Sequence, residues 1–230
     1  MPTPIIDVII PAFNEQEAMG LVVRDSPKGL VRHIVVVNNA SSDKTSEMAR
    51  AAGAIVVDQP ERGYGNACLK GIAQVATHEP PPDIVVFIDA DNSDHPEQMT
   101  EVVTPIVEGH ADFVIGSRAL GHRDAGSMMP QQIFGNWLAT RMLKLFYGVK
   151  YTDLGPFRAV RWEALQAMGM RDRTFGWTVE MQLKAAKQGL RITEVPVDYR
   201  KRIGFSKISG TVKGSVLAGW KIITTIIKYR

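Results

Sequence analysis

The sequence has very little cysteine. Cys68 is the single cysteine among 230 residues, so no internal disulfide can form and no multi-cysteine zinc site can be built. It falls inside an expected helix, where a thiol is typical of packing rather than of a nucleophile. Since the first residues also lack the basic stretch and apolar core of a signal peptide, we expect a cytoplasmic protein.

Long apolar runs and nucleophile motifs are also missing. No window approaches the roughly 20 apolar residues that span a bilayer, so a soluble or peripheral protein is expected. The five histidines show no metal-type spacing, and no Gly-x-Ser-x-Gly elbow is present. At 45% hydrophobic and 22% charged residues, the composition excludes a disordered chain, and no nucleic-acid partner is expected.

The first half of the chain alternates between two kinds of segment. Short, fully apolar runs predict strands at 5–10, 33–37, 54–57, 83–88 and 112–115. Helix-like stretches separate them at 15–24, 42–52, 67–76 and 96–108. This alternation predicts an α/β fold with a mostly parallel, open sheet flanked by helices. In such sheets ligands bind at the carboxyl ends of the strands, where polar residues cluster in this sequence.

The second half is richer in helix. Its pattern predicts helices at 132–146, 179–188 and 211–229 and one strand at 191–195. The last helix is amphipathic: Trp220 and several isoleucines share one half, and three lysines form a stripe opposite. Two interpretations stay open for it, packing on the domain or lying at a membrane surface with Trp220 at the headgroups.

Two acidic residues follow the strand at 83–88. The carboxylates of Asp89 and Asp91 are hard oxygen ligands, which suit Mg²⁺ or Mn²⁺, and such an ion can bridge nucleotide phosphates. An Asp-x-Asp pair in a solvated loop is the alternative. The nearby Gly63-Tyr64-Gly65 lacks the third glycine of a dinucleotide fingerprint, although a helix N-terminus near phosphates stays open.

Basic residues gather near the C-terminus. Residues 196–230 hold eight Lys or Arg residues against Asp198 alone, a net charge of +7 where the whole chain carries +3. A solvated basic face would explain this. The alternative is that Arg202 and Lys207, around the flexible Gly204, neutralise a diphosphate.

Six segments, in order along almost the whole chain, resemble motifs of the family 2 glycosyltransferases with the GT-A fold. Within that family the resemblance is closest to the dolichyl- and polyprenyl-phosphate sugar synthases. The segments are Ile9-Ile10-Pro11-Ala12-Phe13-Asn14-Glu15, residues 36–43, Asp89-Ala90-Asp91, Gly116-Ser117-Arg118, residues 153–158 and residues 202–207. The resemblance implies one domain over 1–230, with a nucleotide-sugar half (1–118), an acceptor half (119–210) and a C-terminal amphipathic helix (211–230).

The resemblance also implies roles for individual residues. Catalysis is expected from Asp91, Glu180, Arg202 and Lys207. Nucleotide-sugar contacts are expected from Pro11, Ala12, Asn14, Glu15, Asn38, Asn39, Ser41, Gly63, Asp89, Ala90, Asp91, Arg202 and Lys207. Acceptor contacts are expected from Ser117, Arg118, Arg123, Asp153, Arg158 and Trp177. Asp89 and Asp91 are the expected ligands of Mg²⁺ or Mn²⁺.

The implied reaction is an inverting, metal-dependent transfer of a sugar. A UDP-sugar, above all UDP-glucose, is the favoured donor, and a polyprenyl or dolichyl phosphate or another membrane lipid such as a glycolipid is the acceptor. A hydroxyl acceptor would need a general base, for which Glu180 is the candidate, whereas a phosphate acceptor needs none. The alternatives are a GDP-mannose-dependent polyprenyl-phosphate mannosyltransferase and a non-catalytic nucleotide-sugar or membrane-binding module. The expected location is the cytoplasmic membrane face, reached through the C-terminal helix, and a homodimer is left open.

Three departures from the family pattern matter. Asn38-Asn39 stands where the family has an aspartate pair, Ser93 replaces a glutamine, and the chain stops at Arg230, where many relatives continue into membrane helices. With Ser93 in place, the metal site is expected to use water or Asp94.

The asparagine pair yields a prediction about the base. An amide can both accept from uracil N3–H and donate to a neighbouring carbonyl, while a carboxylate only accepts and suits guanine. UDP should therefore bind more tightly than GDP in calorimetric titration. Tighter GDP binding would contradict the uridine assignment.

Overall fold

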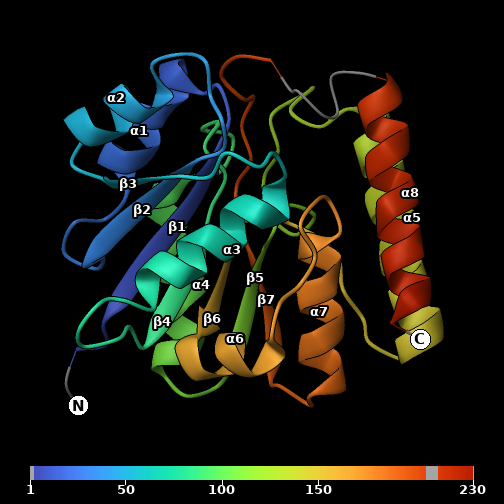
Figure 1. The fold of residues 1–230 in the computed structure, drawn as a ribbon. Helices are drawn as coiled ribbons and strands as arrows, with labels where there is room; N and C mark the ends of the chain where they lie inside the picture. The colour runs from blue at the N-terminus through green and yellow to red at the C-terminus, as the bar shows by residue number, and fades with distance from the viewer. Residues whose placement is uncertain (1–2, 206–211, 230) are drawn as a thin grey trace.

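The computed structural model describes residues 3–205 and 212–229. Within these residues seven strands form one sheet in the order β3-β2-β1-β4-β6-β5-β7 (Figure 1). The strands are β1 (Ile6–Ala12), β2 (His33–Asn38), β3 (Ile55–Asp58), β4 (Ile84–Phe87), β5 (Phe113–Ser117), β6 (Arg158–Arg161) and β7 (Ile192–Pro196). Strands from both halves of the chain thus share one sheet.

Helices cover the sheet and extend beyond one edge of it. They are α1 (Gln16–Asp25), α2 (Thr45–Ala51), α3 (Tyr64–Val75), the 3₁₀ turn η1 (Pro96–Gln98), α4 (Met99–Val107), α5 (Pro130–Tyr147), α6 (Trp162–Met168), α7 (Trp177–Lys187) and α8 (Val212–Lys228). The helix expected over 42–52 begins only at Thr45, because the Asp43 carboxylate accepts hydrogen bonds from the Thr45 backbone and hydroxyl groups. The other predicted helices are present with ends shifted by a few residues.

The apolar runs are continuous because both faces of the sheet are buried. Along β1, Val8 and Ile10 pack with α1, α2 and α4, whereas Ile9 packs on the opposite side with α3 and α7. β1 pairs in parallel with β2 and β4, β2 with β3, and β5 with β7. The predicted α/β fold with a mostly parallel sheet is confirmed.

The sequence pattern missed β6 and α6. β6 lies antiparallel between β4 and β5, and its four residues begin and end with arginine, so no apolar run marks it. Arg158 is only 1% exposed, and its guanidinium donates to the carbonyl oxygens of Leu154, Gly155 and Thr178. A buried arginine that serves backbone carbonyls therefore ties the centre of the sheet to α7.

Three strands are followed by turns that contain a residue in the left-handed backbone region. Asn14, Ala40 and Asn92 have φ values of 53°, 59° and 60°, and they follow β1, β2 and β4. This conformation costs a non-glycine residue about 1–3 kcal/mol, and such costs concentrate at functional sites. The turns therefore mark the carboxyl ends of these three strands as the place to look for a site.

Gly63 and Gly65 permit a close contact between two chain segments. A Cβ atom on Gly65 would lie 2.0 Å from the carbonyl oxygen of Asp172, and Gly63 has a φ of 144°. The N–H groups of Gly65 and Asn66 donate to the carbonyls of Thr174 and Arg173. These donors of α3 are thus used by the loop before α7, rather than being available to a phosphate.

Replacing Gly65 with alanine should push this loop away from α3. Since the clash is with backbone atoms, we expect a loss of about 1–3 kcal/mol in the free energy of unfolding. Urea denaturation measures it, with Gly135→Ala as the control because nothing lies within 4 Å of a Cβ at that position. Equal stability of the two variants would contradict the close contact.

Candidate functional site

A cavity of about 290 Å³ opens at the carboxyl ends of β1 and β4. Nine of the predicted donor-binding residues line it: Pro11, Ala12, Glu15, Asn39, Gly63, Asp89, Ala90, Asp91 and Arg202. Five further lining residues were not predicted: Phe13, Arg62, Tyr64, Ala67 and Phe175. The structure therefore gathers most of the expected donor-side residues around one hollow.

Asp89 and Asp91 lie in the wall of this cavity. Asp89 accepts a hydrogen bond from the Tyr64 hydroxyl at 3.1 Å, and Asp91 Oδ1 accepts from the backbone and hydroxyl groups of Ser93 at 3.0 and 2.5 Å. Desolvation in the cavity, followed by the negative charge of Asp91, raises the pKa of Asp89 to about 7. Two carboxylates that disfavour each other's charge make a place where a cation is stabilising.

The donor set fits a metal ion held together with a nucleotide. Across residues 3–205 and 212–229, no group of three or more His, Cys, Asp or Glu side chains is arranged to hold a metal ion. Mg²⁺, however, is commonly bound by one or two carboxylates plus substrate phosphates. Asp89 and Asp91 supply such a pair, so the residues present fit a shared site and not a protein-only cage.

Asp94 is a further acidic residue beside this pair. It is 1% exposed, and neither carboxylate oxygen has a hydrogen-bond partner within the described part of the chain. Burial, then the charge of Asp89, raises its pKa well above the ordinary aspartate value. Asp94 does not line the cavity, so its expected support of the metal site stays a prediction.

Arg202 connects two strand ends across the cavity. Its guanidinium donates to Glu15 Oε1 at 2.7 Å, 187 residues away in the chain, and lies 3.0 Å from Asp91 Oδ2. Its buried Nε has no hydrogen-bond partner among the residues described. An arginine whose Nε–H has no partner, beside a cavity, is suited to an incoming phosphate oxygen.

The segment that carries Arg202 is fastened to the loop after β4. The N–H of Ile203 donates to the Asp91 carbonyl at 3.0 Å, and that of Arg200 donates to the Ser93 carbonyl at 2.9 Å. The Arg200 guanidinium also bonds the carbonyl and side chain of Asn92. Lys207, the second expected diphosphate cation, lies outside the described residues.

Asn38 and Asn39 use their amides within the protein. Asn39 donates to the carbonyls of Gln59 and Glu61 and accepts from the Gly63 N–H, while Asn38 donates to Asp58 and accepts from the Ser41 N–H. Reading a base with these amides would require breaking those bonds. Asn39 lines the cavity and Asn38 does not, and the amide argument for uracil loses its geometric basis.

Asn14 and Ser41 lie in the turns that follow β1 and β2. The Asn14 N–H donates to the Ser41 hydroxyl at 3.0 Å, and the Asn14 side-chain oxygen accepts from the Ser42 N–H at 2.8 Å. These bonds join the turn after β1 to the turn after β2. Neither residue lines the cavity, so their expected contact with the nucleotide sugar stays a prediction.

The expected acceptor residues are only partly accessible. Arg118 pairs with Asp153 through its Nε and Nη2 atoms at 2.8 and 2.7 Å, and Asp153 is 1% exposed. Ser117 is fully buried, with its hydroxyl 2.6 Å from that of Thr152. Arg123 is exposed and lies beside Tyr199. Ser117 and Asp153 are buried, and their expected acceptor contact stays a prediction.

Three more expected residues are buried away from the cavity. Arg158 serves backbone carbonyls as described, and Trp177 packs against Phe87 with ring centroids 6.0 Å apart. Glu180 is fully buried and accepts from the N–H groups of Arg171 and Asp172 and from the Tyr229 hydroxyl. None of the three lines the cavity, so the expected acceptor contact of Arg158 and Trp177 and the general-base role of Glu180 stay predictions.

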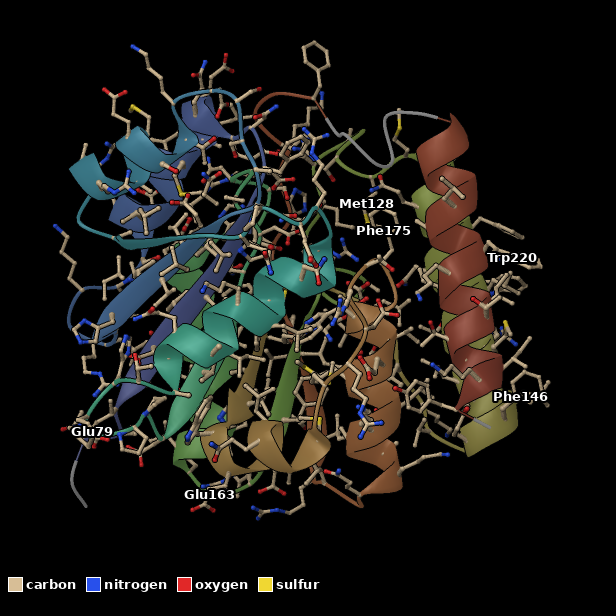
Figure 2. The ribbon with its side chains drawn as sticks, viewed as in Figure 1. Glu79, Met128, Phe146, Glu163, Phe175 and Trp220 are labelled. Atoms are coloured by element: carbon tan, nitrogen blue, oxygen red, sulfur yellow. The ribbon has the colours of Figure 1, made fainter. Side chains whose placement is uncertain are left out.

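The C-terminal helix packs on the domain. Ile226 is buried and accepts a hydrogen bond at its carbonyl from the Tyr147 hydroxyl of α5, while Lys221 pairs with Asp172 at 2.9 Å. Trp220, however, is 68% exposed and points away from the sheet (Figure 2). One face of α8 therefore packs on the protein, and the opposite face is exposed to solvent. Among the residues described, no helix is long and apolar enough to cross a bilayer.

The residues missed from the sequence carry weak signals. The Arg62 guanidinium lies 4.4 Å from the centroid of the Phe13 ring, and Phe175 comes from the loop that Gly65 admits. Aromatic residues in loops follow no periodic pattern, so the sequence does not distinguish those at a binding site from those that only pack. Only the proximity of Phe13 and Tyr64 to recognised motifs pointed toward the site.

Comparison with known proteins identifies the family to which the chain is similar. The family model described as Glycosyl transferase family 2 matches residues 7–169. The chain is 34% identical over 224 residues to an uncharacterized glycosyltransferase of Mycobacterium tuberculosis, covering 95% of this chain and 98% of the relative. It is 30% identical over 225 residues to a dolichyl-phosphate hexose transferase of Haloferax volcanii, covering 97% and 94%.

A third relative and a solved structure extend the comparison. An undecaprenyl-phosphate mannosyltransferase of Micrococcus luteus is 29% identical over 224 residues, covering 91% of this chain and 89% of the relative. The crystal structure of glucosyl-3-phosphoglycerate synthase from Mycobacterium tuberculosis with Mn²⁺, UDP-glucose and phosphoglyceric acid superposes with a TM-score of 0.77 at 22% identity. The superposition covers 98% of this chain and 79% of the synthase chain. This likeness confirms the GT-A fold.

Replacing Glu180 with glutamine tests its position. The change removes the ion pair with Lys184 and mismatches two buried N–H donors, so the free energy of unfolding should fall by roughly 2–4 kcal/mol. Transfer by the folded variant should fall by only a few-fold in a steady-state assay. A loss of about 100-fold in the transfer rate would instead support the role of Glu180 as a general base.

The pH dependence of this effect has a definite sign. Burial raises the pKa of Glu180, but hydrogen bonds from Lys184, Tyr229 and the two N–H groups lower it more, so its pKa lies below the ordinary glutamate value. The stability from this carboxylate is present above the unfolded-state pKa and is lost as pH falls through the folded-state pKa. The difference in the free energy of unfolding between wild type and Glu180→Gln should therefore become smaller as the pH is lowered.

Proposed function

The chain belongs to glycosyl transferase family 2, and we propose that within this family it transfers a sugar from a UDP-sugar to a polyprenyl or dolichyl phosphate. One observation carries the donor side of the proposal. Asp89, Asp91 and Arg202 meet in a single cavity at the carboxyl ends of β1 and β4. A carboxylate pair and an arginine with an unused donor match the needs of a metal-bound diphosphate.

The relatives supply the substrate classes. The names of the Haloferax and Micrococcus relatives specify dolichyl phosphate and undecaprenyl phosphate, and both align over most of this chain. The glucosyl-3-phosphoglycerate synthase structure contains UDP-glucose and Mn²⁺. We take these as support for a lipid phosphate acceptor, a uridine nucleotide and Mn²⁺ or Mg²⁺. The preference for uridine rests on this likeness and no longer on Asn38 and Asn39.

The proposed mechanism assigns each group a place in one displacement. A bound Mg²⁺ or Mn²⁺ would be held by Asp89 and Asp91 and would supply Lewis-acid stabilisation of the leaving diphosphate. Arg202 donates to the same leaving group. An acceptor phosphate oxygen forms a new bond to the anomeric carbon as the bond to the diphosphate breaks, and the configuration inverts.

The acceptor chemistry agrees with the position of Glu180. A phosphate oxygen is already anionic, so the reaction requires no general base. The residues lining the cavity include no histidine, and its carboxylates are those already assigned to Arg202 and the cation. On the acceptor side we propose Arg118 and the exposed Arg123, which flank Tyr199, as the cations nearest the incoming phosphate.

GDP-mannose is the second candidate donor. It is favoured by the Micrococcus relative, whose name specifies mannosyl transfer. The two candidates differ in both base and sugar. Competition between UDP-glucose and GDP-mannose for the same lipid phosphate distinguishes them directly.

Transfer of labelled glucose from UDP-glucose to a polyprenyl phosphate in the presence of Mn²⁺ tests the proposal. Asp91→Asn should lower the rate at least about 100-fold, because a charge that stabilises the leaving group is lost. Asp25→Asn, at an exposed position on α1, is the matched control and should leave the rate unchanged. Product formation that is the same in both variants would exclude the assigned role of Asp91.

A further inference from the structure

Exposed apolar side chains are concentrated on two neighbouring helices. Among the side chains of α5 and α8 that the structure describes, seven large apolar ones are exposed: Ile133, Phe134, Trp137, Leu145, Leu217, Trp220 and Ile227. In the rest of the described chain such residues are scattered singly or sit in loops, as at Met48 on α2 and Val107 on α4. We call the outer sides of α5 and α8 the α5–α8 face; Figure 1 shows the two helices running together at one side of the molecule.

This face lies opposite the packed side of each helix. On α5, Ala139 and Leu143 are buried, and Phe134, Trp137 and Arg141 follow one another at helical spacing on the other side. The rings of Phe134 and Trp137 lie 5.8 Å apart. On α8, Thr225 and Ile226 are buried, while Trp220 and Ile227 are exposed. The apolar side chains are therefore presented outward by helices that the core holds in place.

The charge of the face has one sign. Neither α5 nor α8 contains an aspartate or glutamate. Arg141, Lys144 and Lys228 are exposed on them, and the Arg141 guanidinium lies 5.5 Å from the Trp137 ring centroid. Aromatic residues among cations, with no acid present, are the composition of an interfacial helix.

We propose that the α5–α8 face docks on the surface of a membrane rich in anionic lipids. Its indole rings would lie at headgroup depth, while the cations meet lipid phosphates. The proposal goes beyond the transfer reaction, since it concerns a surface outside the cavity, and it holds whichever donor is used. It widens the expected membrane contact from the last helix to a two-helix face.

A second copy of the chain fits this face less well. In a symmetric pair the same patch meets itself, so Arg141, Lys144 and Lys228 would face like charges. No carboxylate on either helix could compensate them. Charge complementarity therefore favours an anionic lipid surface over self-association.

Vesicle sedimentation with the full chain tests the proposal without any sugar substrate. Vesicles of phosphatidylcholine with about 30% phosphatidylglycerol should retain the protein at low salt, and pure phosphatidylcholine should retain much less. Arg141→Gln/Lys144→Gln should weaken partitioning by about 25-fold, at about fivefold per cation. Trp137→Ser/Trp220→Ser should weaken it by at least about tenfold at all salt concentrations.

Two matched controls keep the result interpretable. Arg50→Gln/Lys70→Gln removes two exposed cations from α2 and α3, and Met48→Ser removes an exposed apolar side chain elsewhere. Both should bind like wild type. Equal binding by controls and test variants, or no binding to anionic vesicles, overturns the proposal. It is also overturned if the tryptophan variant changes the oligomeric state in light scattering, which would assign the face to self-association. Because no transfer is measured, none of these outcomes bears on the donor or acceptor.

Discussion

The contact of Arg202 with Glu15 and Asp91 is the interaction on which the site depends. It joins the end of β1, the end of β4 and the segment after β7 in a single ion-paired cluster. Without a cation at this point, two partly buried acidic groups would face one cavity. An arginine serves better than a lysine here, because its planar fork reaches two carboxylates at once and still has a donor left over.

The scaffold beneath this cluster is made rigid by unusual backbone and side-chain features. Left-handed residues lie in the turns that follow β1, β2 and β4. Gly65 admits the loop before α7, which brings Phe175 into the cavity wall. Arg158, expected to contact the acceptor, donates to the Thr178 carbonyl of α7, and Glu180, expected as a general base, accepts from the Asp172 N–H in the loop before α7. These two charged side chains therefore stabilise the fold around α7 and the loop before it.

The basic C-terminal region serves more than one purpose. Arg200 and Arg202 are fastened to the loop after β4, and Lys221 pairs with Asp172. Lys228 is exposed on α8, with the cations of α5 nearby in the fold. Among the described residues of this region, Arg202 therefore lies in the cavity wall and Lys228 on an outer helical face. Both places suit phosphate groups, one on a nucleotide and the other on a lipid surface.

The amino-acid sequence by itself determined the alternation of strands and helices, the carboxyl-end location of Asp89 and Asp91, and the family. Those features depend on apolar periodicity and on short motifs, and both are formed by residues that are close together in the sequence. Only the tertiary structure decided which polar groups are used up by the protein itself. Asn39, Glu180 and Arg158 have the chemistry of binding residues, yet each bonds backbone groups of another segment: Asn39 those of Gln59 and Glu61, Arg158 that of Thr178, and Glu180 those of the loop before α7. Such pairing depends on three-dimensional proximity, and no spacing along the sequence encodes it.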